Sequence, residues 1–151
     1  IVLFSSVGYV AFRQYVAKPI QNKEAALANL DSAQEALSVG DYPSALALFK
    51  RAHQADSRDM RTYLPLAVLY LQIENQTVQA RRLLESLLAT QERDRQRILT
   101  ALGIADLMDR RFPEAEKRFN RALEVDPMFK PALINLGANA LIAGDPEKAN
   151  N

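Results

Sequence analysis

The side chains of this sequence that could perform chemistry are few, and they do not form a catalytic set. His53 is the only histidine in the 151 residues, and its neighbours are Lys50, Arg51 and Gln54 rather than a matched acid or nucleophile. General acid–base catalysis by histidine needs such a partner within hydrogen-bond reach. We therefore expect His53 to face solvent, and we expect the chain not to be an enzyme.

Two acidic side chains, Asp106 and Asp109, lie three positions apart beside Arg110 and Arg111. A calcium site needs more oxygen ligands than these, whereas acids and bases at helical spacing form local ion pairs. The sequence has no cysteine, which excludes disulfides, thiolate metal sites and cysteine nucleophiles. No glycine-rich loop precedes a helix, so no phosphate cradle is indicated. The sequence predicts no metal, no cofactor and no small-molecule substrate.

Basic residues gather between Arg81 and Arg97, but Glu85, Glu92 and Asp94 interrupt them. A nucleic-acid site needs a basic face without interleaved acids. The formal net charge of the chain is +1, so there is no general attraction to nucleic acid or to an acidic membrane. We expect a solvated, ion-paired surface here and no nucleic-acid partner.

The strongest signal for the elements that position these side chains is a repeated spacing. The pattern Ala-x3-Phe-x2-Ala occurs at Ala45, Phe49 and Ala52, and it returns 70 positions later at Ala115, Phe119 and Ala122. That interval is about two periods of the 34-residue helical repeat. A further unit lies between them, opening at Tyr63, Leu66, Ala67 and Tyr70 and closing at Ala80, Leu84 and Leu87. Another opens at Leu133, Leu136, Gly137 and Ala140.

These residues resemble the tetratricopeptide repeat family, whose pattern runs from a large residue through Leu-Gly or Leu-Ala, a tyrosine and a glycine turn to Ala-x3-Phe-x2-Ala and a proline. The third unit follows it from Leu99 to Pro127 and departs at Asp106, where the family usually has an aromatic residue. The resemblance implies an all-α fold, a right-handed α-solenoid of about three and a half helix pairs. We expect a repeat domain over residues 24–151, with units at about 26–59, 60–95, 96–129 and a truncated 130–151.

Small residues and turn residues agree with this arrangement. Alanine or glycine at Ala33, Ala67, Gly103 and Gly137 lets a partner helix approach closely, and Phe49 and Phe119 fill the space between units. Gly40 can adopt a positive φ at a helix end, Asp41 can cap the next helix, and Pro43 and Pro113 fit first helical turns.

The amino-terminal segment, residues 1–23, is predicted to be the end of a transmembrane anchor with a basic flank. Residues 1–12 are almost entirely apolar, and Arg13, Lys18 and Lys23 follow with no acid before Glu24. Apolar residues on all faces favour a span over an amphipathic stripe, and basic residues beyond a span favour the cytoplasmic side. We therefore expect a single-pass membrane protein with a cytoplasmic repeat domain, a periplasmic one remaining open. The alternative is a helix that caps the first repeat.

The resemblance also implies a binding surface, because the first helix of each unit lines the inside of the curved stack in this family. Counting along these helices gives a mostly apolar partner-binding groove, which suits an amphipathic helix or an extended peptide. The predicted groove residues are Leu30, Gln34, Leu64, Val68, Arg97, Thr100, Ile104, Met108, Ile134 and Asn135.

Some family members clamp the acidic tails of chaperones with basic and asparagine side chains. The corresponding positions here are Leu30, Gln34, Pro65, Arg97 and Ala101, of which only Arg97 fits, so chaperone-tail binding is disfavoured. We expect a non-catalytic scaffold or adaptor, bacterial in style and anchored in a membrane, with a protein partner in a membrane-associated complex. The alternatives are a soluble adaptor whose first helix is a cap, and the regulatory part of an enzyme whose catalytic domain follows residue 151.

Overall fold

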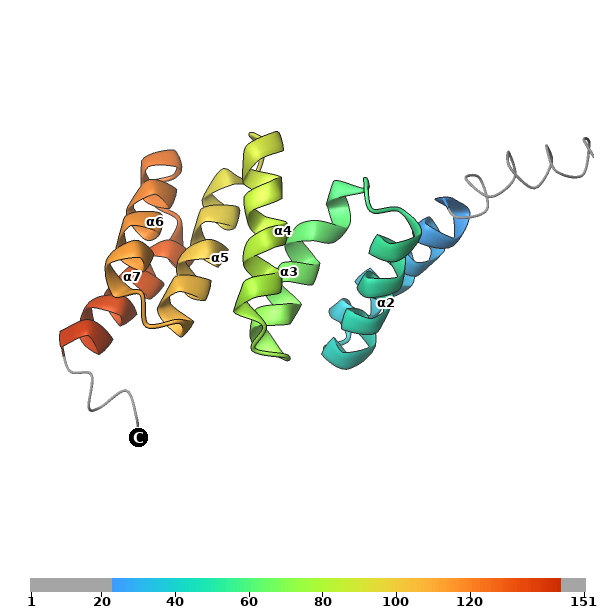
Figure 1. Cartoon of the computed structure of the whole chain (residues 1–151), viewed down its shortest axis with the longest axis horizontal. Coiled ribbons are helices and arrows are strands. Elements are labelled where there is room, and N and C mark those ends of the chain that lie inside the picture. Colours follow the sequence, from blue (N-terminus) through green and yellow to red (C-terminus); the bar gives the residue numbers. More distant parts are fainter. Residues whose placement is uncertain (1–22, 145–151) are drawn as a thin grey trace, which may run out of the picture. The chain divides into compact units, whose positions relative to one another are not determined.

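The computed structural model describes residues 23–144, and within this range every regular element is helical (Figure 1). Helical residues 23–38 come first. They are followed by α2 (Tyr42–Ala55), the short 3₁₀ helix η1 (Met60–Thr62), α3 (Tyr63–Gln72), α4 (Thr77–Thr90), α5 (Arg95–Met108), α6 (Phe112–Val125) and α7 (Lys130–Gly144). The described residues contain no strand, and the prediction of an all-α protein is confirmed.

The chain divides into two compact units, the first ending at Thr62 and the second beginning at Tyr63. Unit 1 holds helical residues 23–38, α2 and η1; unit 2 holds α3 to α7. In unit 2, each helix contacts the next along the chain, and α5 also contacts α3 and α7. Figure 1 shows these helices side by side, joined by short turns that reverse the chain.

Local signals explain why α2 begins where it does. Gly40 has a φ of 78°, a left-handed conformation that costs glycine little. The Asp41 carboxylate then accepts a hydrogen bond from the Ser44 amide at 3.2 Å, and Pro43 lies in the first turn, where no amide donor is needed. The predictions for Gly40, Asp41 and Pro43 are confirmed. Arg110 takes the equivalent left-handed position before α6, with a φ of 57°.

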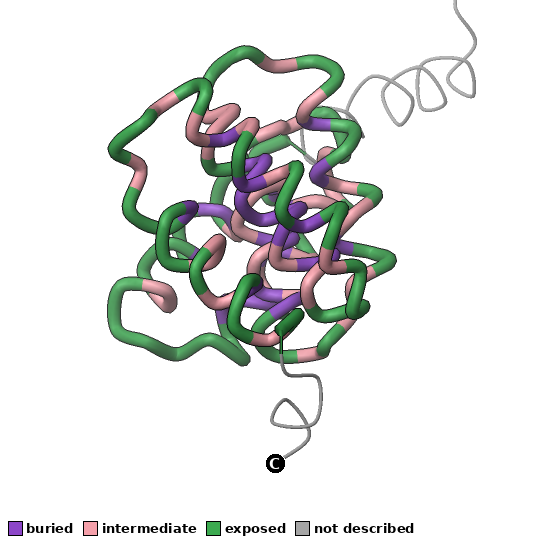
Figure 2. The backbone as a smooth tube through the Cα atoms, turned by 90° about the vertical axis from the view of Figure 1, so that its left-hand side faces the viewer, coloured by how far each residue is buried: buried purple, intermediate pink, exposed green. Residues whose placement is uncertain are grey.

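The core of unit 2 is built by small residues that accept large ones. Phe119 on α6 is completely buried and lies against Gly103 on α5, where an added Cβ would come within 2.5 Å of the Phe119 ring. Leu84 on α4 is also completely buried, as are Ala80 and Ala115. Figure 2 shows that buried residues lie on the helix sides that face neighbouring helices. The predicted close approach of a partner helix at Gly103 is therefore confirmed. Phe119 was predicted to fill the space between units, and this is corrected: its buried ring lies against α5, the other helix of its own unit.

The interface between α6 and its neighbours repeats this packing. Leu99, Ala122 and Ala132 are buried together, one from each of α5, α6 and α7, and Leu123 and Phe129 pack against them. In unit 1, Phe49 is likewise completely buried. Burying a side chain of this size contributes about 1.5–3 kcal/mol, so these contacts hold each helix on the preceding one.

The prediction of a single-pass membrane protein is wrong for the residues described. None of the helices found between residues 23 and 144 combines the length and apolar composition that crossing a bilayer requires. A span takes about 20 apolar residues, and the apolar helices α3 and α7 run for only 10 and 15 residues. Residues 1–22 of the predicted anchor lie outside the described residues. The membrane localisation is therefore not retained.

Candidate functional site

The predicted groove residues that fall in unit 2 all lie on α3, α5 and α7, the first helices of successive helix pairs. Because α5 contacts both α3 and α7, these three helices form one continuous layer. We call its open side the first-helix face. The predicted groove residues that define it are Leu64 and Val68 from α3, Arg97, Ile104 and Met108 from α5, and Ile134 and Asn135 from α7.

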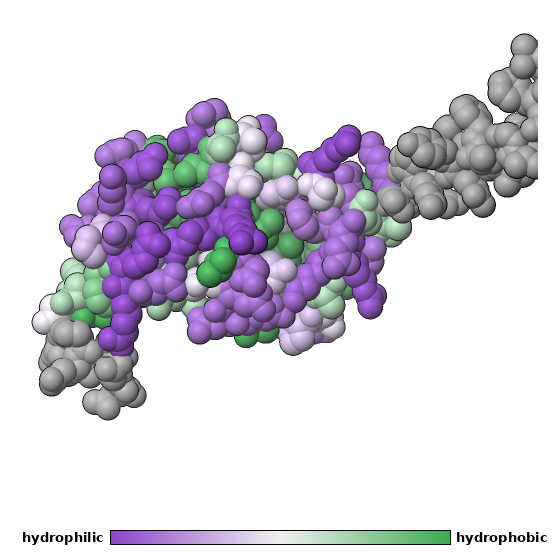
Figure 3. Space-filling view, viewed as in Figure 1, coloured by the Kyte–Doolittle hydropathy of each residue, from purple (hydrophilic) through white to green (hydrophobic). Residues whose placement is uncertain are grey.

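The exposure of these side chains rises towards the α7 end of the face. Leu64, Val68 and Ile104 are half-buried, whereas Met108 is 38% exposed and Ile134 is 70% exposed. In Figure 3, hydrophobic side chains are visible at the end of unit 2 that α7 forms, on a surface that is otherwise mainly hydrophilic. In proteins generally, exposed apolar patches larger than a few hundred Å² mark interaction sites.

The first-helix face has two polar members, Arg97 and Asn135. Arg97 is exposed, and its guanidinium lies 3.6 Å from the Asp94 carboxylate. The Asn135 side-chain amide donates to the Pro131 carbonyl oxygen at 2.7 Å, within its own helix. Arg97, the charged residue of the first-helix face, therefore lies beside the Asp94 carboxylate. The other members of the face, apart from Asn135, are apolar.

Two of the predicted groove residues do not reach the surface. Leu30 is only 1% exposed, because its side chain is part of the core of unit 1. Thr100 is 4% exposed, and its hydroxyl donates to the Gln96 carbonyl oxygen one helical turn earlier, at 2.7 Å. Both assignments are corrected: these side chains support the fold. Gln34, the other predicted residue in unit 1, is exposed.

Two residues of the first-helix face were missed. Leu141 on α7 is one of the most exposed large apolar residues among those described, and it lies two helical turns after Ile134 on the same side. Leu107 on α5 is half-buried and precedes Leu141 by 34 positions. The repeat interval, applied to every position of the first helices, would have found both of them.

A buried ionic cluster holds α5 behind this face. Asp106 is completely buried, and its carboxylate accepts hydrogen bonds from Arg81 of α4 and from Nε of Arg118 of α6, the latter at 2.8 Å. Arg111 adds a longer contact of 3.4 Å, and Arg81 also binds Asp109 at 2.6 Å. Although burial opposes it, the hydrogen bonds to these two carboxylates raise the pKa of Arg81.

The sequence predicted only local pairs of Asp106 and Asp109 with Arg110 and Arg111. The hydrogen bonds to the Asp106 carboxylate come instead from Arg81 and Arg118, which lie on other helices, 25 and 12 positions away. Spacing rules for residues within one helix do not identify such partners. Asp106 stands where the family usually has an aromatic side chain, so a charge cluster replaces an apolar contact between α4, α5 and α6. Removing one partner of a buried ion pair destabilises the folded protein by about 3–5 kcal/mol, because the other charge is left buried and uncompensated. The cluster therefore fixes α5, which carries Ile104 and Met108.

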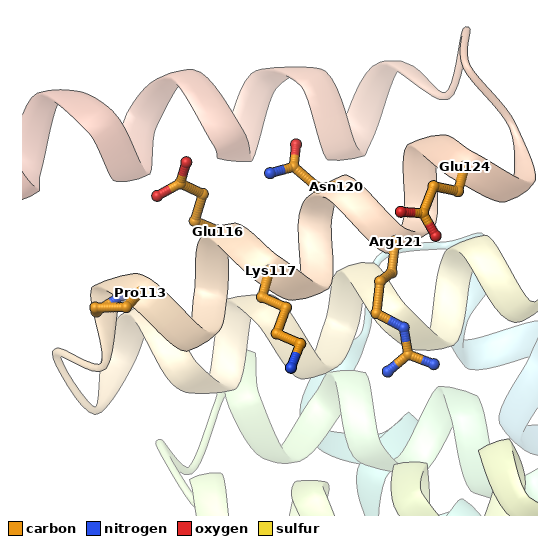
Figure 4. Close-up of a pocket in the computed structure, with 6 residues that line it drawn as sticks. All are labelled: Pro113, Glu116, Lys117, Asn120, Arg121 and Glu124. Carbon is orange, nitrogen blue, oxygen red and sulfur yellow. The ribbon is translucent and has the colours of Figure 1, made fainter.

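The outer side of α6 carries a shallow depression of a different character. Its volume is about 550 Å³, and six residues of α6 line it: Pro113, Glu116, Lys117, Asn120, Arg121 and Glu124. Figure 4 shows Glu116 and Asn120 projecting to one side of the helix and Lys117 and Arg121 to the other. Acids and bases alternate here, so the depression presents no field of one sign.

His53 in unit 1 does not simply face solvent. It is half-buried, and its Nδ1 lies 3.0 Å from the Thr62 hydroxyl, which itself donates to the Asp59 carbonyl oxygen. Because that hydroxyl proton is used, the His53 Nδ1–H is the donor. Burial lowers the pKa of His53. The contact joins α2 to η1 and has a structural role. Among residues 23–144, no group of three or more histidine, cysteine or acidic side chains could hold a metal ion.

Comparisons with known proteins agree with this architecture. Residues 36–103 match the family described as tetratricopeptide repeat. The fold is a tetratricopeptide-repeat fold. No curated protein matches the chain by sequence.

Solved tetratricopeptide-repeat domains superpose on most of the chain. The first such domain of Spaghetti (RPAP3), bound to the HSP90 peptide SRMEEVD, has a TM-score of 0.67 and 19% identity over 82% of this chain and 96% of that one. The second domain of human RPAP3, in complex with the HSP70 peptide SGPTIEEVD, has a TM-score of 0.63 and 19% identity over 81% and 98%. The Arabidopsis OM64 domain has a TM-score of 0.68 and 19% identity over 78% and 96%. These domains share the fold of the present chain.

Proposed function

We propose that this chain is a protein-interaction module whose first-helix face binds an apolar peptide or an amphipathic helix. One observation carries the proposal: α5 and α7 keep large apolar side chains exposed to solvent. Met108, Ile134 and Leu141 are the most exposed of them on the first-helix face. Binding of an amphipathic helix buries such side chains, and Met108 adapts to partners of different shape.

Two solved domains that share this fold are bound to peptides, which supports a peptide as the ligand. The two RPAP3 domains were solved with chaperone peptides that end in Glu-Glu-Val-Asp. A ligand of that acidic kind is disfavoured for this chain, because Leu30 and Ala101 are buried at two of the clamp positions and Pro65 occupies a third. Arg97 alone supplies a cation, and Asp94 lies beside it. The proposed ligand is therefore apolar and does not depend on a terminal carboxylate.

The proposal is tested by selecting peptides from a random display library on the immobilised chain and measuring their affinity by isothermal titration calorimetry. Ile104→Glu places a charge in the middle of the face, where Ile104 is half-buried, and is expected to weaken binding by about 30-fold or more, as loss of a central contact does. Asn120→Glu on the outer side of α6 is the matched control and should leave the affinity unchanged.

Equal affinities for the Ile104→Glu chain and the unaltered chain would reject the first-helix face as the site. Circular dichroism of both variants shows whether the helices remain intact. A selection dominated by acidic carboxyl-terminal sequences, with binding lost in Arg97→Ala, would replace the apolar ligand by a chaperone-type tail.

A further inference from the structure

The first-helix face offers a bound peptide few hydrogen-bond partners. Between the first and last turns of α3, α5 and α7, the polar side chains are Thr100, Asn135 and Asn139. Each of them donates to a backbone carbonyl oxygen of the chain, at 2.7, 2.7 and 3.1 Å. Thr100 and Asn139 are also buried, which leaves the half-buried Asn135 as the polar side chain that a ligand can reach in the middle of these helices.

The same helices offer a ligand almost no charge. No charged residue occurs in residues 62–72 or in residues 131–144, and the charged residue within residues 98–108 is the completely buried Asp106. Arg97, the charged member of the face, lies in the first turn of α5, outside these stretches. A charged ligand side chain that faced the middle of the helices would lose its water without gaining a partner. The side of the ligand that faces the chain is therefore uncharged.

We propose that the ligand of the first-helix face binds as an α-helix of a partner polypeptide, with an uncharged apolar stripe against the chain. This inference rests on the function proposed above, and it decides between an extended peptide and a helix. An extended peptide would bury unpaired N–H and C=O groups against apolar side chains, and each such group weakens binding about tenfold or more. An α-helix pairs these groups within itself, except in its first and last turns.

The spacing of the first helices sets the length and period of the stripe. Neighbouring packed helices lie about 8–10 Å apart, and two turns of an α-helix rise about 11 Å. Because α5 contacts both α3 and α7, a ligand helix that crosses all three meets the next one about every seven residues. The ligand therefore carries apolar residues at i, i+7 and i+14, with others at i+3 or i+4 between them, and contacts Val68, Ile104 and Ile134.

The test uses three fluorescently labelled synthetic peptides of about 18 residues, or five turns, made of leucine, glutamine, glutamate and lysine. The first peptide has its leucines on one helical stripe and its charges on the opposite side. The second has the same composition with leucines at alternate positions, the period of an extended strand. The third is the first peptide with a proline in place of a central glutamine on its outer side, which leaves every leucine in place.

Binding to the 151-residue chain is followed by fluorescence anisotropy. We expect the first peptide to bind saturably. The proline peptide should bind about 100-fold more weakly or worse, because proline breaks a helix interior, and the alternating peptide should bind about tenfold more weakly or worse. The far-ultraviolet circular dichroism of the chain mixed with the first peptide should show more helix than the sum of the separate spectra.

A pair of chain variants locates the binding. Leu141→Glu places a charge on the face at α7, where Leu141 is 78% exposed, and should weaken the first peptide about tenfold or more. Val125→Glu is the matched control, because Val125 is also an exposed apolar residue but lies at the end of α6, outside the first helices. This variant should bind the first peptide with unchanged affinity.

Equal affinities of the first peptide and its proline variant, or tighter binding of the alternating peptide, would overturn the helical ligand. If peptides selected from a random library still lose affinity in the Ile104→Glu chain, the function proposed above stands and only the helical conformation is wrong. Sedimentation velocity showing a dimer that Leu141→Glu dissociates would assign the face to a second copy. Peptide binding that appears only after removal of residues 1–22 would assign it to the chain's own segment, and either result overturns a separate partner.

Discussion

Two glycines at equivalent places in the repeat should respond to the same substitution with opposite signs. Gly103 and Gly137 both lie in the interior of a first helix, 34 positions apart. Replacing either with alanine adds one methyl group and removes the conformational freedom that glycine gives the unfolded chain. The two sites differ in what the methyl group meets.

The magnitude follows from the surroundings of each Cβ. In an interior helical position, alanine stabilises by about 0.5–1 kcal/mol relative to glycine. At Gly103, three ring atoms of Phe119 would lie 2.5, 2.7 and 2.9 Å from the new Cβ, well inside the ordinary carbon–carbon contact of about 3.5–4.0 Å. Phe119 is completely buried, so the ring cannot move without disturbing the core. Such overpacking costs about 1–3 kcal/mol, and a clash this close belongs at the upper end.

Gly103→Ala should therefore destabilise the fold by about 1–2 kcal/mol net, and Gly137→Ala should stabilise it by about 0.5–1 kcal/mol. Urea denaturation followed by circular dichroism at 222 nm measures both, at equal protein concentration and in the absence of any peptide. A double-mutant cycle adds Phe119→Ala, which alone should cost about 3–5 kcal/mol.

With the Phe119 ring removed, the penalty of Gly103→Ala should disappear, because its cause is gone. The reasoning is refuted if Gly103→Ala is neutral or stabilising, or if its cost is the same with and without the Phe119 ring. A destabilising Gly137→Ala would show that the space at Gly137 is already occupied in the isolated chain.

Three further predictions concern charged and titratable groups. Asp106→Asn leaves the arginines of the buried cluster without their carboxylate and should cost about 3 kcal/mol or more in a urea titration; a neutral effect would mean that the cluster contributes little. Because burial lowers the pKa of His53, the unfolded chain binds more protons just below the ordinary histidine pKa of about 6.5. Stability should therefore be complete above that pH and decline as the pH falls below it, and His53→Gln should remove this part of the pH dependence. Asp41→Ala should lower the melting temperature by removing the hydrogen bond to the Ser44 amide, whereas Asp41→Asn, which keeps an acceptor, should change it less; equal losses in both would argue against the cap.

Features that depend on short-range spacing could be predicted from the sequence. Phe49 and Phe119 were placed in the core because the alanines around them recur at helical intervals, and both are completely buried. The turn before α2 was predicted from Gly40 and Asp41, whose roles are dictated by φ and by hydrogen bonding within four residues. Such signals require no knowledge of the neighbouring helices.

Features that depend on contacts between helices could not be predicted. The Asp106 carboxylate is completely buried because arginines of α4 and α6 bind it. Those arginines are 25 and 12 positions away in the sequence, so the residues around Asp106 do not indicate its burial. Leu30 and Thr100 were assigned to the groove from their positions in the repeat, but their exposure depends on what packs beside them, and both are buried. The predicted membrane location rested on composition, and the helices described between residues 23 and 144 do not support it.

The central claim is that the first-helix face, formed by α3, α5 and α7, receives the ligand. Methyl NMR of the isoleucine-labelled chain tests it most directly, with titration of a peptide selected from a random library. The account predicts that the Ile104 and Ile134 methyl signals shift and saturate together, while that of the completely buried Ile98 stays in place. Saturable binding that leaves both Ile104 and Ile134 unmoved would contradict it.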